Sequence, residues 1–226
     1  MNLLRRAWTV YQNEGAAGIR KRGKRIRSQL FNYKWYYIHK LSITNDFELL
    51  PSSLIDIIER LGKRYEVEWL TEKSMEKLQP YLAYRQEPRV SEHKVLEWLR
   101  AGYATVMALD RGKIVGDCWM ALDSFPFPAS NRTLADIMKQ RGYVYTFMAY
   151  VDPQYRAQGI FPLLLGEQVE FIRRKGKKGL IGTVLLRSKS SKKSLENMGF
   201  KWVGKLHIWR VVGREFSKVQ LEEAPW

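Results

Sequence analysis

The sequence has few of the residue types that build disulfides, metal sites or membrane spans. One cysteine, Cys118, occurs in 226 residues, so no internal disulfide can form, as is typical of a reducing compartment. Three histidines and no His/Cys cluster give no expectation of a metal site. No apolar run is long enough to cross a bilayer, and the N-terminus lacks the apolar region of a signal peptide. We therefore expect a cytoplasmic protein.

Acidic residues are also scarce relative to basic ones. The chain carries 39 Lys and Arg against 23 Asp and Glu, a formal net charge of +16. A field of that sign attracts polyanions such as nucleic acid, anionic lipid or a phosphate-rich cofactor. Hydrophobic residues make up 45% of the chain, which excludes wholesale disorder and allows a sizeable core.

Residues 1–40 hold much of this charge, with ten basic residues against one acidic residue, Glu14. Large apolar side chains are interleaved, and Leu4, Trp8 and Tyr11 share one helical face. Basic amphipathic helices lie on anionic membranes or dock on acidic proteins. We predict a basic, helical and aromatic N-terminal extension over residues 1–62. We expect this extension to bind an anionic membrane or an acidic protein, and the first of these would place the protein peripherally at the membrane. Two alternatives stay open: packing of its aromatics on its own domain or on the second subunit of a homodimer, and binding of single-stranded nucleic acid.

The remainder, residues 63–226, alternates strand and helix signals and predicts an α/β domain. Asp110-Arg-Gly-Lys113 between two apolar runs is typical of a hairpin turn. The Phe- and Pro-rich residues 123–142 predict an insertion, either a substrate loop or a packing elaboration. Helices are expected at 52–62, from 71, and at 91–100, 134–141, 159–175 and 189–198; strands are expected at 65–70, 103–109, 114–122, 143–151, 180–186 and 201–212.

The segment 143–176 reads as a strand, a turn and a helix, and it is the strongest functional signal. A helix start exposes unpaired backbone N–H groups and the positive end of the helix dipole. Gly159, directly before the helix, lets an anion approach the backbone, and Arg156 adds a permanent charge. This order of elements predicts a phosphate site.

The run Val151-Asp-Pro-Gln-Tyr-Arg-Ala-Gln-Gly-Ile resembles the acyl-coenzyme A signature of the GNAT acetyltransferase superfamily, with Arg156 and Gly159 at the signature positions. Ser194-Leu-Glu-Asn-Met-Gly-Phe200 is similar to the end of the last helix of that family. The resemblance covers roughly residues 65–212. It implies an α/β fold with a mixed central sheet and flanking helices, with strands 143–151 and 180–186 parallel and splayed.

The resemblance also implies an activity and a cosubstrate. An acyl-CoA, acetyl-CoA by default, would donate its acyl group directly to a primary amine of a small molecule or amino sugar held in the same ternary complex. Its pantetheine would hydrogen-bond to the backbone near Met148, Tyr150 and Val151, and a backbone N–H near Tyr150 would polarise the thioester. The pyrophosphate would bind the turn and the helix start, that is, Arg156, Ala157, Gln158, Gly159, Ile160 and Phe161.

Three positions depart from the family pattern. Phe161 stands where the family has a small residue, and Ser188 stands where it frequently has an asparagine. Leu195 stands where the family often has a tyrosine that acts as the acid. Asp117 is the first candidate for the base, because an acidic group within a strand needs a partner or water. Tyr145 is a candidate proton relay. Ser191 is a candidate acid.

Two further functions remain open beside this one. An aminoacyl-tRNA-dependent aminoacyltransferase uses a related fold and would suit the positive charge, although it needs no pyrophosphate turn. The absent helix tyrosine keeps open a non-catalytic CoA-binding or scaffold protein.

Overall fold

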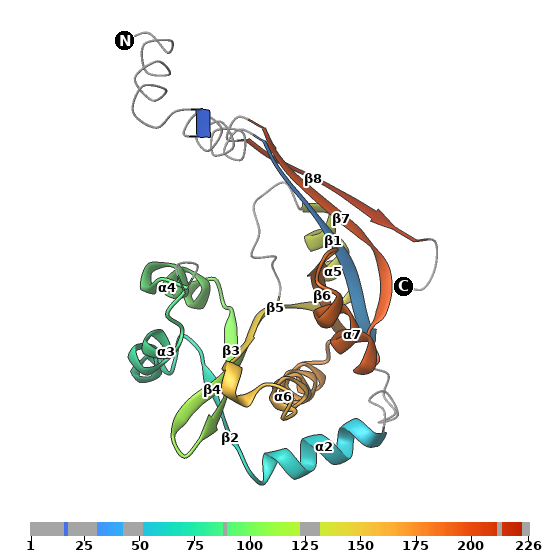
Figure 1. The fold of residues 1–226 in the computed structure, drawn as a ribbon. Helices are drawn as coiled ribbons and strands as arrows, with labels where there is room; N and C mark the ends of the chain where they lie inside the picture. The colour runs from blue at the N-terminus through green and yellow to red at the C-terminus, as the bar shows by residue number, and fades with distance from the viewer. Residues whose placement is uncertain are drawn as a thin grey trace.

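The computed structural model describes residues 16–17, 31–42, 52–87, 90–122, 132–211 and 214–222. Its centre is a mixed sheet of eight strands in the order β2-β3-β4-β5-β6-β1-β7-β8 (Figure 1). The strands are β1 Phe31–Ser42, β2 Glu66–Leu70, β3 Ala104–Asp110, β4 Lys113–Ala121, β5 Tyr143–Val151, β6 Gly179–Leu185, β7 Lys201–Val211 and β8 Arg214–Leu221. The helices are α2 Ser52–Gly62, α3 Leu78–Tyr84, α4 Glu92–Arg100, α5 Arg132–Arg141, α6 Ile160–Arg174 and α7 Lys189–Asn197, with single 3-10 turns η1 Met75–Lys77 and η3 Pro153–Tyr155.

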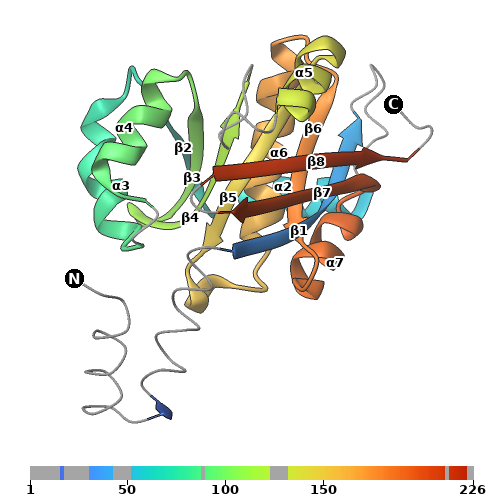
Figure 2. The ribbon, with the colours of Figure 1, turned by 90° about the horizontal axis from the view of Figure 1, so that it is seen from above.

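Helices cover both faces of the sheet, as the alternation of strand and helix signals predicts. On one face, α3 and α4 bury Leu78, Tyr81, Val95 and Trp98 in a core cluster with Trp119 and Phe147. On the other face, α6 buries Ile160, Leu163 and Leu164 against Val115 and Cys118. Figure 2 shows α3 and α4 standing apart from α6 and α2, with β7 and β8 steeply inclined to β5. Cys118 is a buried core residue, as expected for a small apolar side chain.

Most of the predicted elements between residues 52 and 211 are present, with ends shifted by a few residues. The β3–β4 hairpin turns at Arg111 and Gly112, both at positive φ, which suits a two-residue hairpin loop. The helix predicted from Thr71 is wrong at its start. Ser74 Oγ accepts a hydrogen bond from the Thr71 N–H at 2.8 Å, which forms a turn, so regular helix begins only at Leu78.

Strand β1 is the main feature that the sequence did not predict. It lies between β6 and β7 and runs antiparallel to both. The expected N-terminal extension includes residues 31–42 because basic and aromatic residues are frequent there, and the alternation of Phe31-Asn-Tyr-Lys-Trp35 breaks off at Tyr36. Ile38 is fully buried and Lys40 is 7% exposed, as expected for a strand inside a sheet rather than an arm.

Helix α2, also placed in the extension, packs on α6. An added Cβ at Gly166 would lie 2.7 Å from the Ile58 side chain, so the two helices approach closely there. The strand β1 and the helix α2 of the predicted extension are therefore built into the α/β domain. Of the basic amphipathic arm predicted for residues 1–40, residues 1–30 lie outside the described residues except for the exposed, helical pair 16–17, and residues 123–131 of the insertion lie outside them too.

Candidate functional site

Strands β5 and β6 run parallel and pair only at their beginnings. The pairing covers Tyr143–Thr146 against Gly179–Gly182, after which β5 continues beside β4 to Val151 and β6 continues beside β1 to Leu185. The facing edges beyond Thr146 and Gly182 therefore have no strand partner among the described residues. The predicted parallel, splayed pair is confirmed. Unpaired backbone N–H and C=O groups at this point are available to an inserted ligand.

Tyr145 ties the two strands together where their pairing ends. Its hydroxyl lies 2.5 Å from Thr183 Oγ1 on β6, one residue beyond the last paired glycine. The ring is 1% exposed, and burial raises the pKa of the Tyr145 hydroxyl well above its ordinary value. The structure thus gives Tyr145 a bridging position, and its predicted role as a proton relay stays a prediction.

Beyond this point β5 contains a bulge at Met148. Asp117 pairs with Tyr150 and Trp119 with Phe147, so Met148 and Ala149 together face the single residue Cys118. Met148 has φ 52°, a left-handed conformation that a residue with a long side chain adopts at a cost. A bulge re-aims the backbone groups around it. Met148 is one of the residues, with Tyr150 and Val151, that the resemblance assigns to pantetheine.

The turn after β5 leaves backbone donors at the start of α6 without acceptors in the described part of the chain. Ala157 and Gly159 both have positive φ, at 60° and 83°, and Gly159 caps the helix. Among the described residues, none accepts a hydrogen bond from the backbone N–H groups of residues 157–161. The exposed Arg156 donates its Nε–H to Val151 O at 3.1 Å, which holds the guanidinium over the turn while its other N–H groups can reach a ligand. Free donors, a helix dipole and a fixed cation therefore converge here.

The remaining residues of the turn hold its shape. Gln158 accepts a hydrogen bond from Tyr65 Oη at 3.1 Å and donates to Gln154 O at 2.9 Å. Ile160 is buried against β4, where its side chain lies 2.5 Å from an added Cβ at Gly116. Phe161 is half-buried among apolar side chains, so its ring is accommodated by packing. The departure from the family pattern at Phe161 therefore leaves the backbone of the turn intact.

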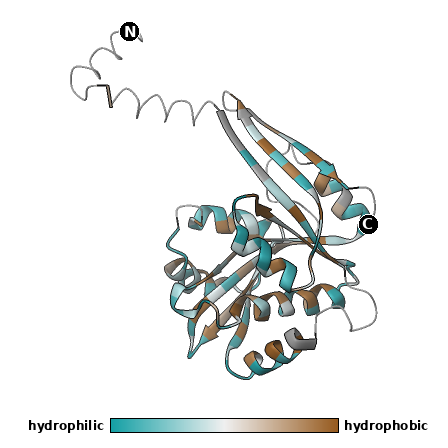
Figure 3. Ribbon diagram, turned by 45° about the vertical axis from the view of Figure 1, so that its right-hand side comes forward, coloured by the Kyte–Doolittle hydropathy of each residue, from teal (hydrophilic) through white to brown (hydrophobic). Residues whose placement is uncertain are grey.

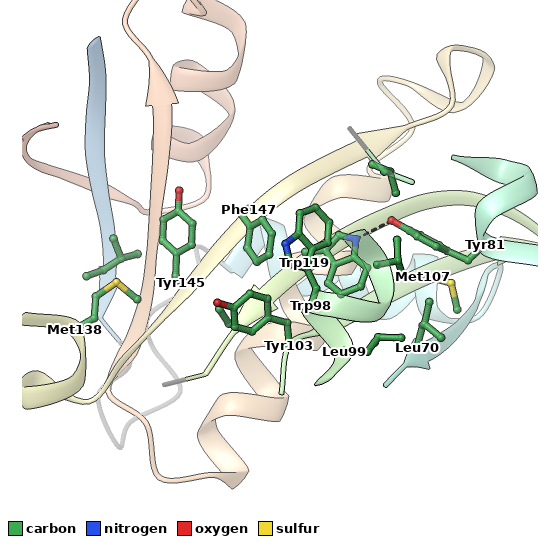
Figure 4. Close-up of a cluster of buried hydrophobic side chains, with 14 of the residues drawn as sticks. Leu70, Tyr81, Trp98, Leu99, Tyr103, Met107, Trp119, Met138, Tyr145 and Phe147 are labelled. Carbon is green, nitrogen blue, oxygen red and sulfur yellow. Dashed lines mark hydrogen bonds between the residues drawn. The ribbon is translucent and has the colours of Figure 1, made fainter. Parts of the chain in front are cut away.

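Asp117, the predicted base, is completely buried on the α3 side of β4. Tyr81 donates its hydroxyl hydrogen to Asp117 Oδ2 at 3.0 Å, and Trp119 Nε1–H donates to Tyr81 Oη at 2.6 Å (Figure 4). Arg85 Nη1 lies 3.6 Å from Asp117 Oδ1. Burial raises the pKa of Asp117 to about 7, although Arg85 and Tyr81 act in the opposite direction. Burial thus opposes ionisation of the carboxyl group, while the neighbouring guanidinium and hydroxyl groups favour it.

Two tyrosines complete a polar cluster around this carboxylate. The Arg85 guanidinium lies 4.6 Å from the Tyr150 ring centre, and Tyr84 meets the same ring edge-on at 5.7 Å. The buried Tyr84 hydroxyl has no hydrogen-bond partner among the described residues. Sequence reasoning missed Arg85, Tyr81 and Tyr84. Tyr81 and Tyr84 lie three residues apart on α3, and Arg85 is the C-cap of that helix. Nothing in the sequence indicates which strand these side chains face.

Ser191 lies apart from these groups. It is exposed in the first turn of α7, with its Oγ 2.8 Å from Ser188 Oγ. Leu195 of the same helix is buried, with Cδ1 3.7 Å from an added Cβ at Gly182. Helix α7 lies on the sheet face opposite Asp117, so the structure does not bring Ser191 together with Asp117.

Aromatic residues of β4 and of the insertion at 123–142 could shape an acceptor pocket, and the structure describes only some of them. Trp119 is fully buried and packs edge-on against Trp98 at 5.0 Å, so it is a core residue (Figure 4). Phe125 and Phe127 lie outside the described residues.

No group of three or more His, Cys, Asp or Glu side chains that could hold a metal occurs in the described part of the chain. None of the helices that the structure describes is long and apolar enough to cross a membrane.

Neither a family model nor a curated protein matches the sequence. Solved structures do match. A GCN5-related N-acetyltransferase-like protein from Streptococcus suis 89/1591 is 11% identical, with a TM-score of 0.54 over 88% of this chain and 68% of that chain. A functionally unknown conserved protein from Staphylococcus epidermidis ATCC 12228 is 14% identical, with a TM-score of 0.51 over 83% of this chain and 65% of that chain.

A protein from Novosphingobium aromaticivorans DSM 12444, described as an acetyltransferase from the GNAT family, is 12% identical, with a TM-score of 0.50 over 78% of this chain and 63% of that chain. Similarity at these identities shows the fold. The chain has the GNAT fold, and the predicted fold class is confirmed: a mixed central sheet flanked by helices.

Proposed function

We propose that the protein is an acyl-CoA-dependent N-acyltransferase, with acetyl-CoA as the default donor and a primary amine of a small molecule or amino sugar as acceptor. The observation that carries this proposal is the start of α6. Backbone N–H groups of residues 157–161 have no acceptor among the described residues, Arg156 is held above them, and the unpaired edge of β5 leads directly into this turn. A ligand with a pyrophosphate at one end and an amide-rich chain behind it fits both features.

In this proposal the pyrophosphate binds Arg156 and the N–H groups at the start of α6. The pantetheine arm then follows β5 past Val151 and Tyr150, and its amides pair with the strand edge that β6 leaves free. The thioester reaches the bulge at Met148, where a re-aimed backbone N–H can polarise its carbonyl oxygen. Holding both reactants here supplies a large part of the rate.

The chemical step forms a C–N bond and breaks a C–S bond. The amine nitrogen attacks the thioester carbon, the amine gives up a proton, and coenzyme A leaves as a thiolate. Asp117 is the proposed acceptor of that proton, because its pKa of about 7 matches the task and Tyr150 pairs with it beside the bulge. Since the carboxyl group is completely buried, the proposed transfer to it requires an intervening water.

The thiolate takes up a proton from water or from a side chain on α7. Leu195 cannot donate one, and Ser191 remains the proposed donor on that helix.

Thermal shift separates this function from its alternatives. Melting temperature is measured with acetyl-CoA, coenzyme A and tRNA, for wild type, Arg156→Glu and the matched control Arg100→Glu, which changes an exposed arginine on α4. We expect both CoA ligands to raise the melting temperature of wild type and Arg100→Glu, and Arg156→Glu to lose most of that increase. An increase with tRNA alone favours the aminoacyltransferase. No increase with either CoA ligand rejects the proposed site.

A CoA shift without turnover identifies a non-catalytic binding protein. Release of free thiol from acetyl-CoA is therefore followed with a panel of amino sugars and small amines. Turnover with at least one amine is the expected result.

A further inference from the structure

Strands β1, β7 and β8 form the end of the sheet away from α3 and α4, and one side of this end is aromatic and basic. The strand register places Tyr37 opposite Lys205, His207 opposite Lys218, and Trp209 opposite Phe216. Opposed residues share a face, and so do alternate residues of one strand. We call this side the ribbon face, with Tyr37, Trp202, Lys205, His207, Trp209, Phe216 and Lys218 as its members. Figure 3 shows the alternation of hydropathy along these strands.

The ribbon face exposes large apolar groups. Trp202 is 36% exposed and Phe216 is 42% exposed, and only Met75 and Leu186 match them among the described hydrophobic residues. Trp209 stacks beside Phe216, with ring centres 6.0 Å apart and planes at 15°. Exposed aromatic side chains gathered on one surface mark an interaction site more often than scattered ones do.

The same face is electropositive. Lys205 and Lys218 flank His207, and the pKa of His207 lies below its ordinary value because of burial first and then because of these two ammonium groups. Lys192 of α7 lies over the Tyr37 ring at 4.8 Å. Its neighbour Glu196 lies 3.6 Å from the Lys192 ammonium group and offsets only part of this charge.

The segment that precedes β1 in the sequence is also positively charged. β1 begins at Phe31, which pairs with Val211 beside the β7–β8 turn, and the 30 residues before it contain eight Lys or Arg and one acidic residue. Like charges repel, so neither this basic segment nor a second copy of the ribbon face is a favourable occupant. The partner that fits is anionic.

The ring geometry distinguishes between two anionic partners, a nucleic acid and a lipid bilayer. Stacking on nucleic acid bases requires open ring faces. The Tyr37 ring is covered by Lys192 at 4.8 Å, and Lys205 lies over the Trp202 ring at 5.7 Å. Trp202 Nε1–H already donates to Gly204 O at 2.7 Å, which leaves only its apolar edge for a partner. Apolar ring edges beside lysine ammonium groups suit the boundary between acyl chains and phosphate headgroups.

We propose that the ribbon face docks the protein on an anionic bilayer surface, with Trp202, Trp209 and Phe216 at the headgroup level and Lys205 and Lys218 on lipid phosphates. Basic residues close to such a surface each strengthen binding. The acyl-CoA turn follows β5, and β6, β1 and β7 separate β5 from β8, so substitutions on β8 test docking without touching that turn.

Vesicle flotation of the full chain tests the proposal, using neutral phosphatidylcholine vesicles and vesicles with added phosphatidylglycerol. The variants are Lys218→Glu, Phe216→Ser and their combination, all at exposed positions. Matched controls are Lys113→Glu and Met75→Ser, which make the same changes at exposed residues far from β8. We expect binding to anionic vesicles only, unchanged in the controls and reduced about tenfold or more in the combined variant.

An unchanged acyl-CoA thermal shift in each variant shows that the fold and the proposed cosubstrate site are intact, so a loss of flotation can be assigned to the ribbon face. Full flotation of the combined variant overturns the proposal. So does equal binding to neutral vesicles, or binding of single-stranded poly(U) that the combined variant loses while flotation persists.

Discussion

Asp117 is the residue on which the proposed chemistry depends most. Its carboxyl group is completely buried beside Tyr81 and Arg85, and burial raises its pKa from 3.8 to about 7. The sequence could single it out, because a carboxylate inside a strand is costly without a partner. Its surroundings could not be predicted, since Arg85 and Tyr81 lie more than thirty residues away along the chain.

Ionisation of Asp117 predicts the pH dependence of activity. A base works in its ionised form, so turnover should rise as pH increases through about 7 and then level off. Asp117→Asn should lower turnover by about 10²- to 10⁴-fold and remove this rise. Initial rates between pH 5.5 and 9 provide the measurement, with Asp56→Asn on the exposed side of α2 as control. A rise near pH 7 that survives in Asp117→Asn contradicts the role of base.

The same pKa also affects stability, with a definite sign. Between pH 3.8 and about 7 the folded protein keeps a proton on Asp117 that the unfolded chain releases. Asp117 therefore lowers the free energy of unfolding as pH rises across this interval, and its contribution is constant above it. Chemical denaturation of Asp117→Asn should lack this component. Comparison with wild type at pH 5 and pH 8 isolates it.

At the scale of elements, the start of α6 combines a proposed binding role with a packing role. Gly159 has φ 83°, and an added Cβ would lie 2.5 Å from Leu61 Cδ1 of α2. The sequence indicated the glycine and the anion site at this turn. It could not indicate the contact with α2, because Leu61 belongs to a segment assigned to the N-terminal extension.

Gly159→Ala should therefore destabilise the protein and weaken CoA binding together. A left-handed conformation costs a residue with a Cβ about 1–2 kcal/mol, before any displacement of Leu61. For a chain of this size we expect a fall of about 2–8 °C in melting temperature. Gly62→Ala is the matched control, because nothing lies within 4 Å of its added Cβ. Equal melting temperatures for the two variants would show that the conformation of Gly159 is not needed.

Two whole elements escaped prediction from the sequence. β1 alternates over Phe31-Asn-Tyr-Lys-Trp35, but Tyr36, Tyr37 and Ile38 interrupt this period of two, and the pairing with β6 and β7 is what identifies the whole segment as a strand. β8 follows β7 directly and pairs with it from Gly204 to Val211. The predicted elements lie where apolar periodicity is clear. Of the two that were missed, β1 is recognisable from its pairing with strands distant in sequence, and β8 is an edge strand that pairs with β7 alone.

At the scale of the whole molecule, two proposed binding surfaces lie on different strands of one sheet. The turn before α6 would bind acyl-CoA beside β5 in the middle of the sheet, and the ribbon face of β1, β7 and β8 at its end would contact anionic lipid. The net charge of +16 would favour both proposed partners, since each presents phosphate. The sequence predicts an attraction to anions, and the arrangement of strands suggests which surfaces to test.

Arg156 and the start of α6 are proposed to bind the pyrophosphate of coenzyme A. Isothermal titration of wild type and Arg156→Glu with coenzyme A and with pantetheine, which lacks the pyrophosphate, forms a thermodynamic cycle. We expect Arg156→Glu to weaken coenzyme A about tenfold or more and to leave pantetheine unchanged, because only one of the two ligands carries the group that Arg156 would bind. Equal weakening of both ligands, or of neither, would contradict the claim.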